Sequence, residues 1–243
     1  MELIGAGAQA RVYREGDLAV KAFAPDCPAS AIYFEAALTA AAAQCGLPVA
    51  APRGVQRREG GDVLLMDYVA GVNLNDWTRA HPDHLEEGFA RLVALQRRIH
   101  AQHPYLPVRQ RDRLGDQIRG SALLDPARRA RLLAQLDALP DGDALCHGDY
   151  HGGNVLMQGE RLTVIDWPNA TIGCPEGDAC RSYLLYRLVD EGLGEGYLTA
   201  YCRSAGVSAA AVLRWLPVSA AARLSDAQGE RDKLFAWMDS TTG

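Results

Sequence analysis

The sequence predicts an α+β protein of two lobes: a small N-terminal lobe with a mixed sheet and one helix, and a larger, mainly helical lobe after it. Two observations support this. In the first 69 residues, short apolar runs alternate with turns that contain Gly and Asp, which is typical of strands. From residue 70 onward, apolar residues recur at helical spacing. We therefore expect domains at residues 1–69 and 70–243.

The strands of the first lobe are expected on either side of a single helix. A turn of Glu, Gly and Asp joins the first two strands, as a hairpin requires. The Ala-rich helix begins near Ser30 and ends at Gly46 and Pro48, because Gly followed by Pro is a common helix stop. The expected strands cover residues 11–14, 18–23, 54–58 and 63–69.

The second lobe is expected to carry helices with a short pair of strands between them. Asp83 and Glu86 form a capping-box pattern before a helix over residues 85–99. Further helices follow Pro126 and Glu176. Between them, residues 144–147 and 162–166 are predicted to form a hairpin pair.

Composition excludes several classes of protein. The 243 residues are 48% hydrophobic, and 25 basic against 30 acidic residues give a net charge of −5, which argues against binding a nucleic-acid backbone. No stretch approaches 18 strongly apolar residues, so no membrane association is expected. The six cysteines contain no C-x-x-C pair. We expect a cytoplasmic protein whose partners are small molecules, and the oligomeric state stays open.

The segment HGDYHGGN at residues 147–154, with IDW at residues 165–167, contains the side chains that could carry chemistry. Mg²⁺ in phosphoryl-transfer sites takes a few carboxylate or amide oxygens together with substrate phosphates. Asn154 and Asp166 suit this metal-ligand role. Asp149 suits the role of the base that accepts a proton from an attacking hydroxyl.

This pattern resembles the aminoglycoside phosphotransferase and choline kinase group, small-molecule kinases built on the protein-kinase fold. The resemblance implies a bilobal protein-kinase-like fold with ATP and Mg²⁺ as cofactors. It also implies transfer of the γ-phosphate of ATP, bound between the lobes, to a hydroxyl group of a small molecule. Gly177-Asp178 resembles a Gly-Asp pair whose role in these kinases is structural.

The resemblance extends upstream to the nucleotide contacts. Residues 4–12 resemble the glycine-rich phosphate loop, in which glycines let main-chain N–H groups approach phosphates. Lys21, one of only two lysines in the chain, matches the strand lysine that binds phosphates, and Glu35 is its ion-pair partner. Residues 63–69 resemble the hinge whose main chain binds adenine. The implied nucleotide-binding residues are Gly5, Gly7, Val12, Lys21, Glu35, Asp67 and Val69.

The acceptor is expected to be small. Eleven residues separate Asp166 from Asp178, too few for the activation loop of a protein kinase. The resemblance points to a small, often cationic acceptor such as an aminoglycoside, choline or an amino alcohol. Acidic residues in the C-terminal helices could receive its positive groups: Asp190, Glu191, Glu195, Glu230 and Asp232.

Two other functions fit parts of the sequence. His147, Asp149 and His151 form an H-x-D-x-H pattern that could bind a metal in a hydrolase, although this leaves Lys21 and Asn154 without a role. A catalytically silent relative that binds a nucleotide or a partner is the other alternative.

Overall fold

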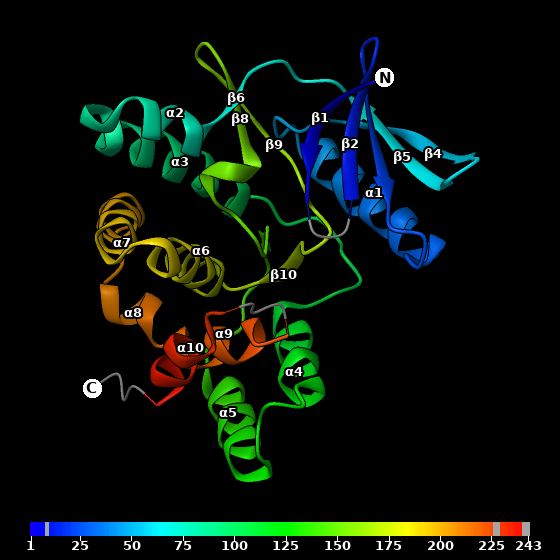
Figure 1. Cartoon of the computed structure of the whole chain (residues 1–243). Coiled ribbons are helices and arrows are strands. Elements are labelled where there is room, and N and C mark those ends of the chain that lie inside the picture. Colours follow the sequence, from blue (N-terminus) through cyan, green and yellow to red (C-terminus); the bar gives the residue numbers. More distant parts are fainter. Residues whose placement is uncertain (8–9, 226–228, 240–243) are drawn as a thin grey trace. The chain divides into compact units, whose positions relative to one another are not determined.

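The computed structural model describes residues 1–7, 10–225 and 229–239 (Figure 1). The chain divides into two compact units. The first unit combines Met1–Ala80 with Gly152–Asn169, and the second combines His81–His151 with Ala170–Gly243. An N-terminal sheet and a helical C-terminal part confirm the α+β class. The expected functional division between residues 69 and 70 stays a prediction.

A five-stranded sheet forms most of the first unit. Its strand order is β1-β2-β3-β5-β4, and every neighbouring pair is antiparallel, where a mixed sheet was expected. The sheet is antiparallel because β5 returns between β3 and β4, so β3 and β4, which run in the same direction, are not neighbours. The strands are β1 (Glu2–Ala6), β2 (Ala10–Glu15), β3 (Leu18–Phe23), β4 (Pro52–Arg58) and β5 (Gly61–Asp67).

Helix α1 (Ala29–Gln44) connects β3 to β4 and packs against β4 and β5 (Figure 1). Its bounds lie within two residues of those predicted. The chain leaves the helix through Gly46, whose φ of 72° is a left-handed conformation that glycine adopts without strain. The helix buries Ile32, Glu35 and Leu38, and Glu35 is the one of these that carries a charge.

A second, three-stranded sheet completes the first unit, with strands in the order β6-β8-β9. These strands are β6 (Val72–Asn73), β8 (Val155–Gln158) and β9 (Arg161–Val164). Gly71 approaches β8 so closely that a Cβ atom would collide with the main-chain carbonyl group of Met157, and its φ is 139°. Glycine is therefore required where the chain passes from residue 69 to β6.

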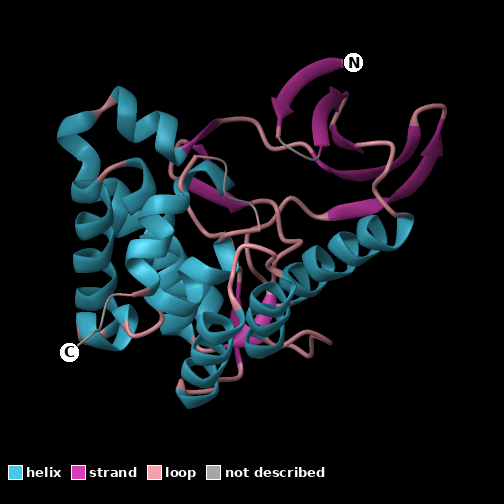
Figure 2. Cartoon of the chain, turned by 60° about the horizontal axis from the view of Figure 1, so that its bottom comes forward, coloured by secondary structure: helices cyan, strands magenta, loops and turns pink. Residues whose placement is uncertain are grey.

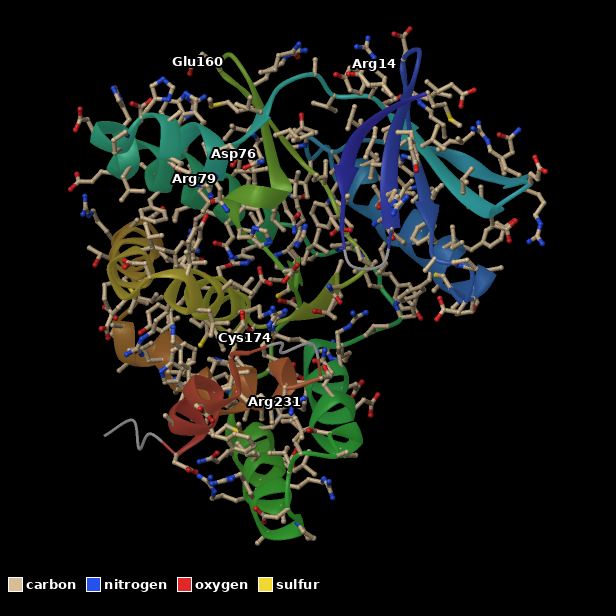
Figure 3. All side chains as sticks on the ribbon, viewed as in Figure 1. Arg14, Asp76, Arg79, Glu160, Cys174 and Arg231 are labelled. Carbon is tan, nitrogen blue, oxygen red and sulfur yellow. The ribbon has the colours of Figure 1, made fainter. Side chains whose placement is uncertain are left out.

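Helix α2 (Leu74–Ala80) fixes the loop that precedes β8. The side chain of Asn73 accepts a hydrogen bond from the N–H group of Asp76 at 2.9 Å and so caps the helix. Asp76 and Arg79 form an ion pair of 2.6 Å on the same helix (Figure 3). Asn75 lies against the 3₁₀ turn η2 (Gly152–Asn154). A Cβ atom on Gly152 would collide with the side chain of Asn75.

The predicted hairpin between residues 144–147 and 162–166 is wrong. Strand β9 pairs with β8, and β7 (Ala144–Cys146) pairs with β10 (Thr171–Gly173). The physical reason is local. Gly159, with a φ of 57°, allows a tight turn between β8 and β9, so β9 pairs with its nearest neighbour in sequence.

The second unit consists mainly of helices (Figure 2). Helices α3, α6 and α7 pack together, and the ring of Phe89 on α3 meets Tyr186 on α6 edge to face, with centroids 5.3 Å apart. The helices are α3 (Leu85–His100), α4 (Gln110–Gly120), α5 (Pro126–Ala138), α6 (Pro175–Val189), α7 (Glu191–Ala205), α8 (Ala209–Leu213), α9 (Leu216–Arg223) and α10 (Arg231–Met238).

The predicted capping box before α3 is also wrong. Asp83 lies inside the 3₁₀ turn η1 (Pro82–His84), and the N-cap of α3 is His84, which makes no side-chain capping bond. Proline favours the first position of a helical turn, so η1 begins at Pro82, whereas the capping pattern requires Asp83 to precede the first turn.

Across the described ranges, no single helix is long and apolar enough to cross a membrane. The bent pair formed by 191–205 and 209–223 passes that test by length and composition alone.

Candidate active site

Lys21 joins two carboxylates in the first unit. Its Nζ atom lies 2.6 Å from Oε1 of Glu35 and 2.7 Å from Oδ1 of Asp166. The three side chains come from β3, from α1 and from the segment after β9. The structure therefore brings together three of the predicted site residues, two of which are 145 positions apart in the sequence.

Burial makes this ion-pair cluster electrostatically strong. Burial alone would lower the pKa of Lys21, but the charges of Asp166 and Glu35 outweigh it and raise this pKa above its ordinary value. Burial also raises the pKa of Glu35, and the charge of Lys21 opposes that rise only in part. Lys21 is thus held as an ammonium group at neutral pH.

Asn154 and Asp166 lie at one end of the hairpin formed by β8 and β9. Val155 pairs with Val164, and the N–H group of Ile165 donates to the carbonyl oxygen of Asn154 at 3.0 Å. Asn154 is buried, whereas the Asp166 side chain is 41% exposed. The local fold therefore brings an amide and a carboxylate, both hard oxygen donors, to the same strand end, and this donor set fits Mg²⁺.

The main chain at Asp166 has an unusual conformation. Its φ of 66° makes it the one non-glycine residue with a positive φ among the residues that the structure describes. Such a conformation is costly for a residue with a side chain and is concentrated at functional sites. This is a second, independent indication that the position of the Asp166 carboxylate matters.

The predicted phosphate loop, residues 4–12, includes the end of β1 and the start of β2. The N–H group of Gly7 donates to the carbonyl oxygen of Ala10 at 2.9 Å, and Gly5 pairs with Val12. Val12 in turn lies opposite Lys21 in the register of β2 and β3, which fixes the loop beside the lysine strand. Residues 8 and 9 of this loop lie outside the described residues.

The predicted hinge residues Asp67 and Val69 lie at and just after the end of β5. The N–H group of Asp67 donates to the carbonyl oxygen of Ala51 at 2.9 Å, and its carboxylate binds Arg53 through two hydrogen bonds. That N–H group is therefore engaged within the first unit. Val69 is half-buried.

Asp149 belongs to the second unit, in the loop after β7. Its Oδ1 atom lies 3.4 Å from Nη2 of Arg181 on α6, and its Oδ2 atom lies 3.8 Å from Nε2 of His151. The next residue, Tyr150, is fully buried and donates a hydrogen bond from its hydroxyl group to the carbonyl oxygen of Leu92 at 2.8 Å. The loop is thus anchored immediately beyond Asp149.

Asp178 anchors the same loop on its other side. Its Oδ1 atom accepts a hydrogen bond from the N–H group of Gly148 at 2.7 Å. Its Oδ2 atom lies 2.9 Å from Nε2 of His100 and 3.3 Å from Nε2 of Gln96. Burial alone would raise the pKa of Asp178, but the hydrogen bonds from His100 and Gly148 outweigh it and keep this pKa below its ordinary value of 3.8.

The low pKa of Asp178 predicts a pH-dependent contribution to stability. A carboxylate whose folded pKa is depressed stabilises the fold above its unfolded pKa, and this contribution is lost as pH falls through the folded pKa. We expect Asp178→Asn to lower the free energy of unfolding by about 2 kcal/mol at neutral pH. The deficit relative to the unmodified chain should shrink below about pH 4.

Urea unfolding of both proteins at about pH 7, 5 and 3 measures this difference. A deficit that stays the same at all three values would contradict the assignment of an ionised Asp178.

The sequence did not single out three residues of this network: Gln96 and His100, which contact Asp178, and Arg181, which contacts Asp149. None of them lies in a motif with a chemical signature. The first two lie 82 and 78 positions from Asp178, and Arg181 lies 32 positions from Asp149. The helical spacing of Asp178 and Arg181 is the one signal that places both on one face of α6.

The acidic residues expected to receive a cationic acceptor are mostly engaged within the second unit. Glu191 pairs with Arg187 at 3.0 Å, and Glu195 accepts a hydrogen bond from the hydroxyl group of Tyr183 at 3.0 Å. Asp190 caps α7, and Glu230 lies 3.6 Å from Arg223. A cationic acceptor stays a prediction.

The H-x-D-x-H pattern does not form a metal cluster. Within the described part of the chain, no group of three or more His, Cys, Asp or Glu side chains is arranged to hold a metal ion. The geometry of His147, Asp149 and His151 thus gives no support to the hydrolase alternative.

Comparison with known families identifies the family of this chain. The model of the phosphotransferase enzyme family (APH) matches residues 1–216. The chain belongs to the phosphotransferase enzyme family. No curated protein sequence matches this phosphotransferase.

Solved structures show the same fold. A choline/ethanolamine kinase family protein from Mesorhizobium loti aligns with a TM-score of 0.67 and 19% identity over 98% of this chain and 88% of that chain. A thermostable mutant of aminoglycoside phosphotransferase APH(4)-Ia aligns with a TM-score of 0.69 and 20% identity over 98% of this chain and 94% of that chain. The streptomycin–ATP–APH(2'')-IIa ternary complex aligns with a TM-score of 0.60 and 14% identity over 99% of this chain and 91% of that chain. These similarities confirm the protein-kinase-like fold of this phosphotransferase.

Proposed function

We propose that this phosphotransferase moves the γ-phosphate of ATP, in the presence of Mg²⁺, to a hydroxyl group of a small molecule. The observation that carries the proposal is the ammonium group of Lys21, held between the buried Glu35 and the more exposed Asp166. A lysine fixed in this way presents a compact positive charge beside a carboxylate that can bind a metal, and phosphoryl transfer from a nucleotide requires this combination.

The nucleotide would be held by residues of the first unit. Lys21 would bind its phosphates, with Glu35 keeping the ammonium group in place. The segment that contains Gly5, Gly7 and Val12 would cover the phosphates, and the main chain at Asp67 and Val69 would bind the base. The relatives support nucleotide use, since aminoglycoside phosphotransferases of this fold are described in complexes with ADP, AMP-PNP and ATP.

Asn154 and Asp166 would hold the magnesium ion, which supplies neutralisation of the charge on the phosphates. Carboxylate and amide oxygens are suitable ligands, and the exposed part of Asp166 permits access. The positive φ at Asp166 fixes where its carboxylate leaves the main chain.

Asp149 would act as the base. Its carboxylate would orient the acceptor hydroxyl group and accept its proton as the oxygen attacks the γ-phosphorus in line with the leaving ADP. Because this transition state is loose, positioning and charge neutralisation carry most of the rate enhancement.

The acceptor would be a small molecule with a hydroxyl group. The segment between Asp166 and Asp178 is too short to form the protein-binding loop of a protein kinase. Two structural relatives are described with the hydroxyl-bearing compounds hygromycin B and streptomycin. The acceptor of this chain could come from the same broad class or from the amino alcohols.

An acceptor screen tests the proposal. The purified protein is incubated with ATP and Mg²⁺ and with aminoglycosides, macrolides, amino alcohols or sugars, and formation of ADP and of phosphorylated product is followed. We expect at least one acceptor to yield product and stoichiometric ADP. Nucleotide binding without transfer to any compound would instead support the catalytically silent alternative.

A further inference from the structure

Arg181 on α6 lies beside the carboxylate of the predicted base. Its Nη2 atom is 3.4 Å from Oδ1 of Asp149, and the side chains of Arg181 and Asp149 are 16% and 25% exposed. We propose that Arg181 is a positioning residue for the phosphoryl transfer, which holds the Asp149 carboxylate in its productive orientation. This inference rests on the proposed function, because it takes Asp149 as the base.

Helix α6 contacts Gly148 and Asp149, two consecutive residues of the loop after β7 that contains the proposed base. Asp178 accepts a hydrogen bond from the main chain of Gly148, and Arg181, three positions later, reaches the side chain of Asp149. Residues three positions apart share one face of a helix. One helix face therefore fixes both the main chain of the loop and the direction of its carboxylate.

The helix that carries Arg181 is itself held firmly. The Asp178 side chain is fully buried and lies 2.9 Å from Nε2 of His100 on α3. Gln96, also on α3, reaches the same carboxylate and accepts a hydrogen bond from the hydroxyl group of Tyr197 on α7 at 2.6 Å. A guanidinium group on such a rigid element can hold its partner to the tolerance that catalysis requires.

Both oxygen atoms of Asp149 lie near a basic side chain. Oδ1 lies 3.4 Å from Nη2 of Arg181, and Oδ2 lies 3.8 Å from Nε2 of His151. In the proposed step the acceptor O–H bond breaks and its proton moves to the Asp149 carboxylate. The acceptor oxygen forms a bond to the γ-phosphorus, and ADP leaves with the electron pair of the broken P–O bond.

Steady-state kinetics of Arg181→Ala test the proposal once the acceptor screen has identified a substrate. A misplaced base should lower kcat by roughly 10- to 100-fold. The KM for ATP should change by less than about threefold, because Arg181 does not belong to the nucleotide-binding unit. Arg187→Ala is the matched control. This arginine also lies on α6, but it binds Glu191 and Tyr183, and we expect its removal to leave kcat unchanged.

A second readout separates positioning from a structural role. Guanidinium chloride, kept below the concentration that shifts the melting temperature, should restore part of kcat to Arg181→Ala and should not restore Asp149→Asn. Arg181→Met, which keeps the apolar stem and removes the charge, should fold and should lose kcat in the same way.

The outcomes that overturn the proposal differ from those that overturn the function. Wild-type kcat in Arg181→Met or Arg181→Ala, together with an inactive Asp149→Asn, would remove Arg181 from the mechanism and leave the phosphotransfer intact. Loss of kcat without guanidinium rescue would assign Arg181 a structural role. A wild-type chain that phosphorylates no acceptor would contradict both the proposed phosphotransfer and the positioning role of Arg181.

Discussion

Asp149→Asn is expected to reduce kcat for phosphoryl transfer by about 10³-fold, since a positioned general base contributes roughly 10²- to 10⁴-fold. The amide is nearly the same size as the carboxylate and cannot accept the hydroxyl proton at neutral pH. Nucleotide binding should be unchanged, because the proposed nucleotide contacts lie in the first unit and Asp149 lies in the second. Product formation under saturating ATP, with ATP affinity from calorimetry, measures both quantities.

Asp143→Asn provides the matched control for this substitution. It makes the same chemical change in the second unit at a side chain that is 85% exposed, and we expect full activity. If Asp149→Asn transferred phosphate at the wild-type rate while Asp143→Asn did the same, the assignment of the base would be wrong.

Lys21→Met is expected to affect both activity and stability. Loss of a fixed charge at the phosphates should lower kcat/KM by about 10²- to 10³-fold. The substitution also leaves Glu35, whose side chain is 4% exposed, without its cation. Removal of one partner of a buried ion pair lowers the free energy of unfolding by about 3 kcal/mol or more, because the charge of the remaining buried carboxylate is no longer compensated.

The pH dependence identifies Glu35 as the source of that instability. Burial raises the pKa of Glu35, and the charge of Lys21 lowers it. Without Lys21, the pKa of Glu35 therefore rises further above its unfolded value. A carboxyl group with a raised folded pKa loses stability as pH increases, because the unfolded chain releases its proton first. Lys21→Met should therefore be less stable at about pH 8 than at about pH 5.

A double-mutant cycle completes this test. Adding Glu35→Gln to Lys21→Met should recover part of the stability and remove the pH dependence, and it should not recover transfer. Lys233→Met, at the other lysine in the chain, is the control and should change neither property. Equal stability of Lys21→Met and the unmodified chain at both pH values would show that the cluster is not energetically coupled.

The sequence by itself determined the order and the chemistry of the candidate site. The glycines and prolines that end elements are local signals, and they placed α1 within two residues of its observed bounds. The spacing of Asp149, Asn154 and Asp166 is likewise local, since a short loop and a hairpin join them. These features are readable because their physical causes act over a few residues.

The tertiary structure decided which distant residues meet. Lys21 and Asp166 are 145 positions apart. Arg181 on α6 reaches Asp149, and His100 on α3 reaches Asp178, although neither Arg181 nor His100 lies in a recognisable motif. The predicted strand pair failed for a local reason, since the tight turn at Gly159 pairs β9 with β8, and β7 pairs instead with β10. The meeting of Lys21 with Asp166, and of Arg181 with Asp149, has a different origin. Contacts of this kind depend on how many elements bury their apolar faces together, and no single stretch of sequence contains that information.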